Sequence, residues 1–180
     1  MSTYRVICAG FGGQGVMSMG QLLTYAGMIE GKEVSWLPSY GPEMRGGTAN
    51  CSVTVSDKPI GSPIISGDAT CAIIMNLPSL EKFEQEIEPG GILLINSSLI
   101  HQKPKRDDIN SYYIPANELS QELGGTKFAN MIMLGAYLKL TNTVEVESVL
   151  EAFKKVFGPK KEKYLGVNRE AIQLGMKQIL

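Results

Sequence analysis

The sequence has few residues that bind metals. Its 180 residues include three cysteines and one histidine, and no two cysteines form a Cys-X-X-Cys pair. Iron–sulfur clusters usually need four thiolates, and zinc needs three or four nitrogen or sulfur ligands. We therefore expect no metal bound by this chain alone. The wide spacing of Cys8, Cys51 and Cys71 indicates no disulfide framework, and the apolar runs around Cys8 and Cys71 predict that both are buried as small hydrophobic residues.

An excess of charge of one sign is also absent. Lysine and arginine together number 17 against 18 acidic residues, for a net charge of −1. This balance gives no bulk attraction to nucleic acid or to an anionic membrane, and we expect neither as a partner. No apolar run approaches the length of a membrane span. Residues 1–5 lead almost directly into an apolar strand and leave no room for a signal peptide, so we expect a cytoplasmic protein.

The most informative stretch is an apolar strand that runs into a glycine-rich turn and then a helix. The strand begins at Arg5, and helical spacing of apolar residues predicts a helix over 16–30. Gly10, Gly12 and Gly15 match the G-X-G-X-X-G pattern, and Gly13 is a fourth glycine. Glycine is required where φ is positive or where another group approaches too closely for a Cβ. Strand, glycine turn and helix are typical of the opening of a doubly wound α/β domain.

Two common ligands of such a turn are disfavoured. A dinucleotide site needs an acidic residue after the second strand, but residues 34–38 contain none. A phosphate-binding loop of the P-loop type needs lysine before the helix, but Val16 follows Gly15 directly. Two readings remain open: an anion lies over the turn, or the turn packs tightly against a neighbouring loop. The candidate ligand or interface residues are Gly10, Gly12, Gly13, Gln14 and Gly15.

A second unusual stretch spans Pro38 to Asn50. Its prolines and glycines predict a loop that is neither helix nor regular strand. Because it follows the second strand, it is expected at the same sheet edge as the glycine turn, where open α/β sheets bind ligands. Six residues are candidates for a ligand or a partner chain: Tyr40, Gly41, Glu43, Arg45, Gly46 and Gly47. The alternative is a rigid structural connection in which Glu43 pairs with Arg45 or a helix end.

The remaining pattern predicts further strands and helices. Strands are expected at 33–36, 51–55, 71–75, 92–95 and 111–114, with a turn at 89–91, and helices at 76–87, 116–123, 128–140, 146–157 and 168–179. Continuous apolar strands suit a parallel sheet that is covered on both faces. We therefore predict one α/β domain over residues 1–180, a doubly wound, mostly parallel, Rossmann-like three-layer sandwich.

Two helices carry signs of close packing. Gly20 and Gly27 lie two turns apart on the first helix and predict close approach of a strand or a second subunit. The helix over 128–140 is apolar nearly all round, which indicates burial on both sides. One side is expected to face the sheet, and the other a second protomer or a partner chain.

Taken together, the motifs carry a family resemblance. Residues 10–16, followed by 38–47 and then 59–64, resemble the gamma subunit of 2-oxoacid:ferredoxin oxidoreductases over essentially the whole chain. The second motif, which contains Met44 and ends at Cys51, is most similar to that of 2-oxoglutarate enzymes. Branched-chain 2-oxoacid enzymes are close, and pyruvate enzymes are somewhat less so.

The resemblance implies a function for the complex rather than for this chain. Such complexes decarboxylate a 2-oxoacid, pass electrons to ferredoxin and form an acyl-CoA. Thiamine diphosphate is bound by alpha and beta chains, and iron–sulfur clusters lie in beta and in a small ferredoxin-like delta chain. The gamma chain is an accessory domain that packs against them. The sequence likewise has no evident catalytic residues, so the isolated chain is expected to be inactive.

Other readings stay open at this point. Coenzyme A is a possible co-substrate whose phosphates could bind Arg45 and the helix N-terminus at Gly13 and Gly15; alternatively, Glu43 and Arg45 only make hydrogen bonds between subunits. Two other classes are a free-standing small-ligand or nucleotide-binding protein and a purely structural oligomerisation domain. An isolated chain could also form a homo-oligomer, because its partner-facing surface would be uncovered.

Overall fold

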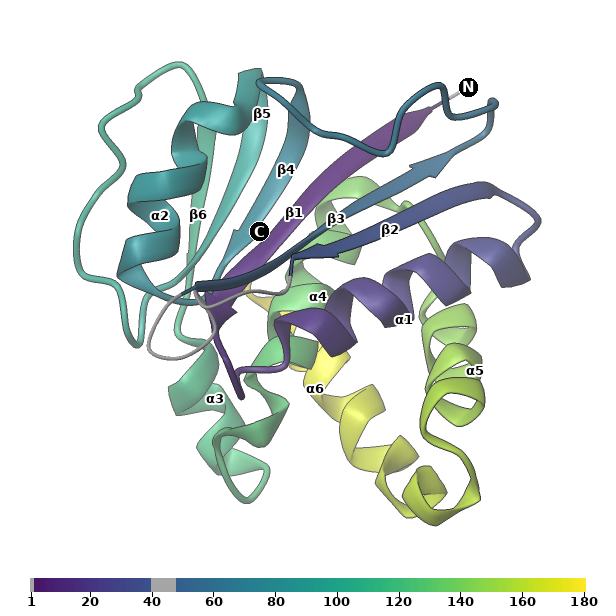
Figure 1. Cartoon of the computed structure of the whole chain (residues 1–180). Coiled ribbons are helices and arrows are strands. Elements are labelled where there is room, and N and C mark those ends of the chain that lie inside the picture. The colour runs from purple at the N-terminus through teal and green to yellow at the C-terminus, as the bar shows by residue number, and fades with distance from the viewer. Residues whose placement is uncertain (1, 40–47) are drawn as a thin grey trace.

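The computed structural model describes residues 2–39 and 48–180. Six strands form one mixed sheet in the order β2-β3-β1-β4-β5-β6 (Figure 1). The strands are β1 (Thr3–Phe11), β2 (Glu33–Ser39), β3 (Thr48–Ser56), β4 (Ala69–Ile74), β5 (Ile87–Asn96) and β6 (Asn110–Ile114). β1, β4, β5 and β6 are parallel, whereas β3 is antiparallel to both β1 and β2. Five strands therefore run in one direction, which confirms the prediction of a mostly parallel sheet.

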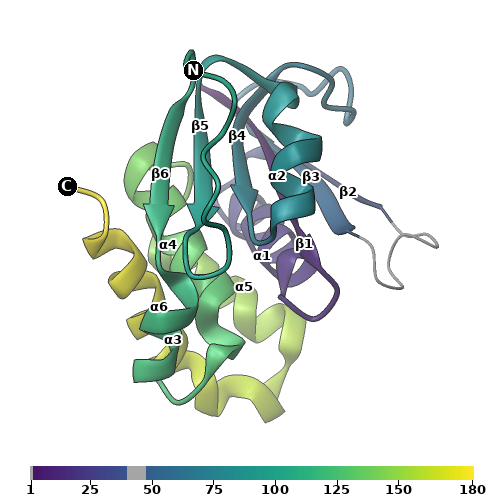
Figure 2. The ribbon, with the colours of Figure 1, turned by 90° about the vertical axis from the view of Figure 1, so that its left-hand side faces the viewer.

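Helices cover both faces of the sheet. They are α1 (Val16–Ile29), α2 (Leu77–Phe83), α3 (Ala116–Glu122), α4 (Ala129–Thr141), α5 (Val146–Phe157) and α6 (Leu165–Lys177), with short 3-10 helices η2 (Glu84–Glu86), η3 (Thr126–Phe128) and η4 (Pro159–Tyr164). Figure 2 shows α2 on one side of the sheet and α4 and α6 on the other. Alternate residues of β1 feed two separate cores: Val6 and Cys8 pack with α1 and α4, and Ile7 and Ala9 pack with α2. The predicted doubly wound α/β class is thus confirmed.

The glycines of α1 explain how tightly this helix sits on the sheet. A Cβ at Gly20 would overlap the Cys51 sulfur of β3, and a Cβ at Gly27 would overlap Val34 of β2. The element that approaches them is therefore the sheet of the same chain. Of the two alternatives left open by the sequence, a strand or a second subunit, the strand is the one found.

Helix α4 is buried all round, as its sequence predicted, because every residue from Ala129 to Leu138 is buried. The prediction that a partner chain covers its second face is wrong. That face is covered by α6, where Gly135 of α4 lies against the backbone of Ile172 and Gly175 of α6 lies against the backbone of Ile132. The two glycines let the helix backbones approach so closely that one chain completes the layer by itself.

Three predicted boundaries also need correction. Pro38 belongs to β2 and Thr48 to β3, although the stretch between Pro38 and Asn50 was predicted to exclude strand. Proline is tolerated there because β2 is an edge strand with a free side. The helix predicted to reach Ile87 ends at Phe83 and continues only as the 3-10 turn η2.

The predicted turn at residues 89–91 is an irregularity inside one strand. β5 pairs with β4 through Ile87 and Ala69, and again through Ile92 and Cys71, so the extra residues of β5 form a bulge. Gly90 makes this possible with φ +79°, and its N–H donates to the carbonyl of Asp108 at 2.7 Å. The proline and glycines therefore mark a bulge and not the end of a strand.

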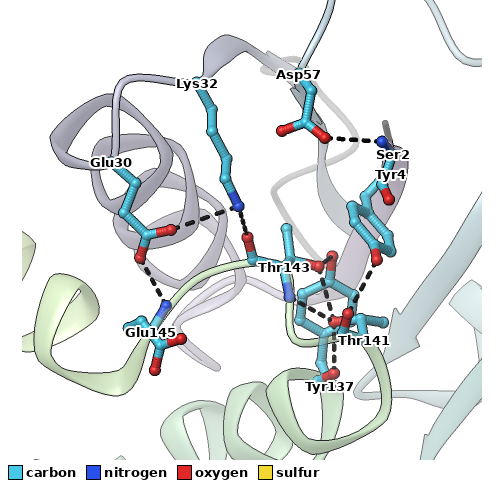
Figure 3. A network of polar contacts seen from close by, with 9 residues as sticks. All are labelled: Ser2, Tyr4, Glu30, Lys32, Asp57, Tyr137, Thr141, Thr143 and Glu145. Carbon is cyan, nitrogen blue, oxygen red and sulfur yellow. Dashed lines mark hydrogen bonds and ion pairs between the residues drawn. The ribbon is translucent and has the colours of Figure 1, made fainter.

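A network of hydrogen bonds links the α4–α5 loop to β1 and α1, at the end of the sheet opposite the glycine turn (Figure 3). The hydroxyls of Tyr137 and Thr143 lie 2.7 Å apart, and Tyr4 of β1 donates to the carbonyl of Thr141 at 2.9 Å. Lys32, just after α1, donates to the carbonyl of Thr143. The loop between α4 and α5 is thereby tied to both β1 and α1.

Candidate functional site

The glycine turn joins the carboxyl end of β1 to the start of α1. Its backbone is left-handed at Gly13, with φ +90°, and at Gly15, with φ +77°. Both values lie in the left-handed region that favours glycine, which confirms the expectation of positive φ in this turn. A Cβ added at Gly10 would lie only 2.7 Å from the Cβ of Met75, the residue after β4. By contrast, a Cβ added at Gly13 would have no atom within 4 Å. Gly10 is therefore required for packing, and Gly13 is open to a ligand or a partner.

Gln14 acts as a latch within the turn. Its side-chain oxygen accepts a hydrogen bond from the N–H of Phe11 at 2.6 Å, and its amide nitrogen donates to the carbonyl of Met75 at 3.2 Å. These two bonds tie the turn to the carboxyl end of β4. The side chain of this candidate residue is thus already engaged within the chain, and it is the backbone around Gly13 that faces outward.

Gly15 is the N-cap of α1 and is held from the other side by Asn130. The side-chain amide of Asn130 donates to the carbonyl of Gly15 at 3.2 Å, and a Cβ at Gly15 would overlap that amide. Sequence reasoning missed Asn130, although one signal was present: an amide residue in the otherwise apolar run around Met131 and Ile132. A buried amide costs free energy unless it is hydrogen-bonded, so its presence indicates a specific partner.

A pocket of about 230 Å³ opens beside the turn, and we call it the edge pocket. Its lining residues are Gly13, Gln14, Gly15, Met75, Asn117, Thr126, Lys127 and Ala129. β1 and β4 are neighbouring strands whose following helices, α1 and α2, cover opposite faces, so the edge pocket lies at the topological switch point. In open α/β sheets this is where ligands bind.

The electrostatics of the edge pocket favour an anion. The N-cap Gly15 gives α1 no side-chain cap, and no acidic residue lies in the first turn. The first N–H groups of the helix are therefore free to bind a ligand and carry a partial positive charge. Lys127 adds a full charge, and no acidic residue of the described chain lines the pocket.

Buried amides behind this edge add hydrogen-bonding capacity. Asn96, at the end of β5, donates to the side-chain oxygen of Asn117 at 2.8 Å. The side-chain oxygen of Asn96 and the amide nitrogen of Asn76 are buried without a partner in the described part of the chain. Sequence reasoning did not single out these asparagines, because a lone asparagine after a strand is also a common turn or cap residue.

The strands that flank the second predicted loop reach the same edge of the sheet as the glycine turn. Ser39, the last residue of β2, pairs with Asn50, which pairs with Ala9 near the end of β1, and Thr48 pairs with Phe11. The strands on both sides of the loop therefore end beside the glycine turn, as expected. The candidates Tyr40, Gly41, Glu43, Arg45, Gly46 and Gly47 lie outside the described residues.

The three cysteines lie in the sheet and away from the edge pocket. Cys8 of β1 pairs directly with Cys51 of β3, all three thiols are free, and all three side chains are buried. This confirms the prediction that Cys8 and Cys71 are buried hydrophobic residues. Within residues 2–39 and 48–180, no three His, Cys, Asp or Glu side chains are grouped so as to hold a metal. No helix in these two ranges has both the length and the apolarity needed to cross a membrane.

Sequence comparisons give a consistent family. The family model described as pyruvate ferredoxin/flavodoxin oxidoreductase matches residues 5–178. The ketoisovalerate oxidoreductase subunit VorA of Methanothermobacter thermautotrophicus is 38% identical over 172 residues, which are 95% of this chain but only 35% of VorA. The 2-oxoglutarate synthase subunit KorC of Methanocaldococcus jannaschii is 36% identical over 148 residues, covering 80% of this chain and 78% of KorC.

Solved structures agree with this. The gamma subunit of a keto/oxoacid ferredoxin oxidoreductase from Geobacter sulfurreducens superposes with a TM-score of 0.82 at 26% identity, covering 97% of both chains. The 2-oxoglutarate:ferredoxin oxidoreductase of Magnetococcus marinus, solved with 2-oxoglutarate, coenzyme A and succinyl-CoA bound, gives a TM-score of 0.87 at 24% identity. The match covers 99% of this chain and 31% of that longer chain. It therefore supports the fold of this chain over nearly its whole length.

Proposed function

Because the chain belongs to the pyruvate ferredoxin/flavodoxin oxidoreductase family, we propose that it is the gamma component of a 2-oxoacid:ferredoxin oxidoreductase. The observation that carries this proposal is the family match over residues 5–178, together with a gamma-subunit structure that covers 97% of the chain. The complex would decarboxylate a 2-oxoacid, transfer electrons to ferredoxin and release an acyl-CoA.

The chemical step is assigned to partner chains. Cys8, Cys51 and Cys71 are buried in the sheet and do not fit a cluster site, so thiolates for iron–sulfur clusters would come from other subunits. Thiamine diphosphate and the clusters would be held by alpha, beta and delta-type chains. This chain would pack against them, with the glycine turn and the loop after β2 at the shared sheet edge.

The substrate proposed first is 2-oxoglutarate, on the basis of the motif that ends at Cys51. KorC, a 2-oxoglutarate synthase subunit, supports this choice at 36% identity. Ketoisovalerate is the second candidate, because VorA is 38% identical over a longer aligned stretch. Both acids share the 2-oxoacid group on which the chemistry acts and differ in the side chain that a partner subunit would have to recognise.

The edge pocket is proposed to receive part of coenzyme A. Its phosphates would meet the free N–H groups of α1 and the ammonium group of Lys127. Arg45, a candidate from the sequence motif, is proposed as a further phosphate contact. The competing role for Glu43 and Arg45 is a set of hydrogen bonds to partner subunits. An Arg45→Met variant separates the two roles: a higher KM for coenzyme A with the complex intact supports the ligand role, whereas loss of assembly supports the interface role.

Co-expression with the genes encoding the partner chains tests the proposal as a whole. An affinity pull-down on this chain should bring down brown, thiamine-containing partners. The purified complex should reduce viologen when both coenzyme A and a 2-oxoacid are present. Faster reduction with 2-oxoglutarate than with ketoisovalerate or pyruvate would support the substrate assignment, and the reverse order would move it to the branched-chain acid. A chain that elutes alone and colourless in the presence of those partners would contradict the subunit role.

A further inference from the structure

Cys8 and Cys51 lie directly opposite each other on neighbouring strands. Cys8 of β1 pairs with Cys51 of the antiparallel strand β3, and both side chains belong to the core between the sheet and helices α1 and α4. Both are fully buried, and the Cys8 thiol donates a hydrogen bond to the Cys51 sulfur. No function considered above uses this pair.

The position of the pair suits a disulfide. Directly opposed residues of antiparallel strands have Cα atoms about 4.5–5.5 Å apart, and disulfides span about 4.4–6.8 Å. Their Cβ atoms, about 4.5–5.5 Å apart, would have to approach to about 3.5–4.5 Å, and the resulting strain makes such a bond easy to reduce. The third thiol is placed less well, because Cys71 of β4 lies opposite Val6 and not opposite Cys8.

The two thiols of the pair have different chemical roles open to them. The hydrogen bond from Cys8 lowers the pKa of the Cys51 thiol, whereas this bond and burial together raise the pKa of Cys8. The thiolate is the nucleophilic form of cysteine. Cys51 is therefore suited to attack an oxidant first, and Cys8, already in contact with it, is suited to attack second.

The indole N–H of Trp36 is a buried donor beside Cys51. Its nitrogen has no partner at hydrogen-bonding geometry in the part of the chain that the structure describes. A Cβ at Gly20 would overlap the Cys51 sulfur and lie 3.3 Å from this nitrogen, so both atoms border the same small space. The N–H also lowers the pKa of Cys51. A thiolate or a sulfenic acid oxygen on Cys51 would accept from it and remove the cost of an unpaired buried donor.

The pair lies close to an edge of the sheet. β2, which carries Trp36, is an edge strand, and the Trp36 side chain is only partly buried. Edge segments open locally at a lower free energy than the centre of a fold. Opening of this edge would admit a small oxidant to Cys51 while the rest of the sheet stays folded.

We propose that Cys8 and Cys51 form a redox pair that hydrogen peroxide oxidises to a reversible disulfide. The Cys51 thiolate attacks one peroxide oxygen, which breaks the O–O bond, releases hydroxide and leaves a sulfenic acid on Cys51. The Cys8 sulfur then attacks the Cys51 sulfur, which forms the disulfide and releases water. Peroxide gains the two electrons that the thiols lose, and a dithiol reverses the change. The proposal does not rest on the oxidoreductase function.

The disulfide would join the two strands that carry the sequence motifs. Cys8 lies two residues before Gly10, and Cys51 follows Asn50, whose partner on β1 is Ala9. Closing the pair would draw the ends of β1 and β3 together beside the glycine turn. The oxidation state of the pair would thereby affect the turn that lines the edge pocket.

Treatment of the full chain with hydrogen peroxide, followed by mass spectrometry, tests the pairing. We expect the mass to fall by two hydrogen atoms and two of the three thiols counted in denaturant to disappear, with all three restored by dithiothreitol. Digestion with trypsin and Asp-N places the three cysteines in separate peptides. The crosslink should join Cys8 to Cys51, and either the absence of a disulfide or a disulfide that includes Cys71 would overturn the proposal.

Alanine variants, which keep the core apolar, separate the roles of the thiols. Cys8→Ala should stop at the sulfenic acid on Cys51, which dimedone traps, and Cys51→Ala should leave Cys8 unmodified at the same peroxide exposure. Cys71→Ala is the matched control, because Cys71 is buried in the same core, and it should still form the disulfide. Equal dimedone labelling of the Cys8→Ala and Cys51→Ala variants would overturn the assigned order of attack.

Hydrogen exchange tests the link to the glycine turn. The amides of residues 10–15 should exchange more slowly in the oxidised chain than in the reduced chain, because the crosslink restrains β1 and β3. Residues 169–177 of α6 are the internal reference and should exchange alike in both forms. Equal exchange at the turn would contradict the link. None of these readouts is an activity of a complex, so their failure would leave the gamma-subunit role intact.

Discussion

Gly135 on α4 and Gly175 on α6 mark a reciprocal backbone contact between two helices. A Cβ at Gly135 would overlap the carbonyl oxygen of Ile172, and a Cβ at Gly175 would overlap the carbonyl oxygen of Ile132. Each glycine therefore makes room for the backbone of the other helix. The residue that it faces, Ile172 or Ile132, lies three positions before the glycine of that other helix. This contact buries the second face of α4 within the chain, and so leaves that face unavailable to another subunit.

Adding a methyl group at this contact should destabilise the fold. We expect Gly135→Ala and Gly175→Ala each to lower the free energy of unfolding by about 1–3 kcal/mol, because the helices must separate. Urea unfolding followed by circular dichroism measures the change. Gly166→Ala is the control: Gly166 also lies in α6, but nothing lies within 4 Å of its added Cβ. That control should be neutral or stabilising by up to about 1 kcal/mol, and equal destabilisation at all three positions would contradict the contact.

The latch at Gln14 predicts a second stability effect. Gln14→Ala removes the hydrogen bonds to Phe11 and Met75, so we expect a loss of about 1–3 kcal/mol from the free energy of unfolding. Hydrogen exchange should also accelerate at the Phe11 amide. Gln121→Ala, on the exposed surface of α3, removes the same side chain without these bonds and should change stability little. If both variants unfold alike, the latch contributes nothing to stability.

The cysteines should react only when the protein opens. Burial raises the pKa of the Cys71 thiol, and the contact with Cys51 together with burial raises that of Cys8. Both therefore remain protonated thiols at neutral pH, and thiols react slowly compared with thiolates. The hydrogen bond with Cys8 lowers the pKa of Cys51, so the slow reaction expected of this third thiol follows from its complete burial alone. A disulfide reagent such as DTNB should find no rapidly reacting thiol in the native chain and three in denaturant. One fast-reacting thiol in the folded protein would contradict this burial.

Glu30 predicts a loss of stability in acid. Burial acts to raise the pKa of Glu30, but hydrogen bonds from the Glu145 N–H and Ser148, together with the nearby Lys32, outweigh burial and lower this pKa. Figure 3 shows the contacts of Glu30 with Glu145 and Lys32. A carboxyl group whose pKa is lower in the folded state stabilises the fold at pH values above its unfolded-state pKa, about 4.3. This contribution to stability is lost as the pH falls through the folded-state pKa. Glu30→Gln should therefore reduce stability at pH 6 more than at pH 3.

Urea unfolding at the two pH values measures the Glu30 effect. Glu170→Gln is the matched control because Glu170 lies exposed on α6, and it should show the same small change at both values. A Glu30→Gln effect that does not depend on pH would mean that the carboxylate charge is not what the contacts with Glu145 and Lys32 stabilise.

The sequence predicted the local parts of the candidate site better than their surroundings. Positive φ at Gly13 and Gly15 follows from backbone sterics alone, so a motif reveals it. The place of Gln14 in the turn was visible, but its bonds to Phe11 and Met75 were not, because Met75 lies 61 positions away. Asn130 was missed for the same reason: its partner, Gly15, lies 115 positions away.

By itself, the sequence determined the elements: an α/β chain with a glycine turn after its first strand, buried strand cysteines and a fourth helix that is apolar all round. Backbone sterics and side-chain periodicity act over a few residues, so they can be recognised in the sequence without knowledge of tertiary contacts. Only the tertiary structure decided that α6 covers α4 and that Cys8 lies directly opposite Cys51. These relationships depend on which distant surfaces fit together, and shape complementarity between distant segments has no local period to show it.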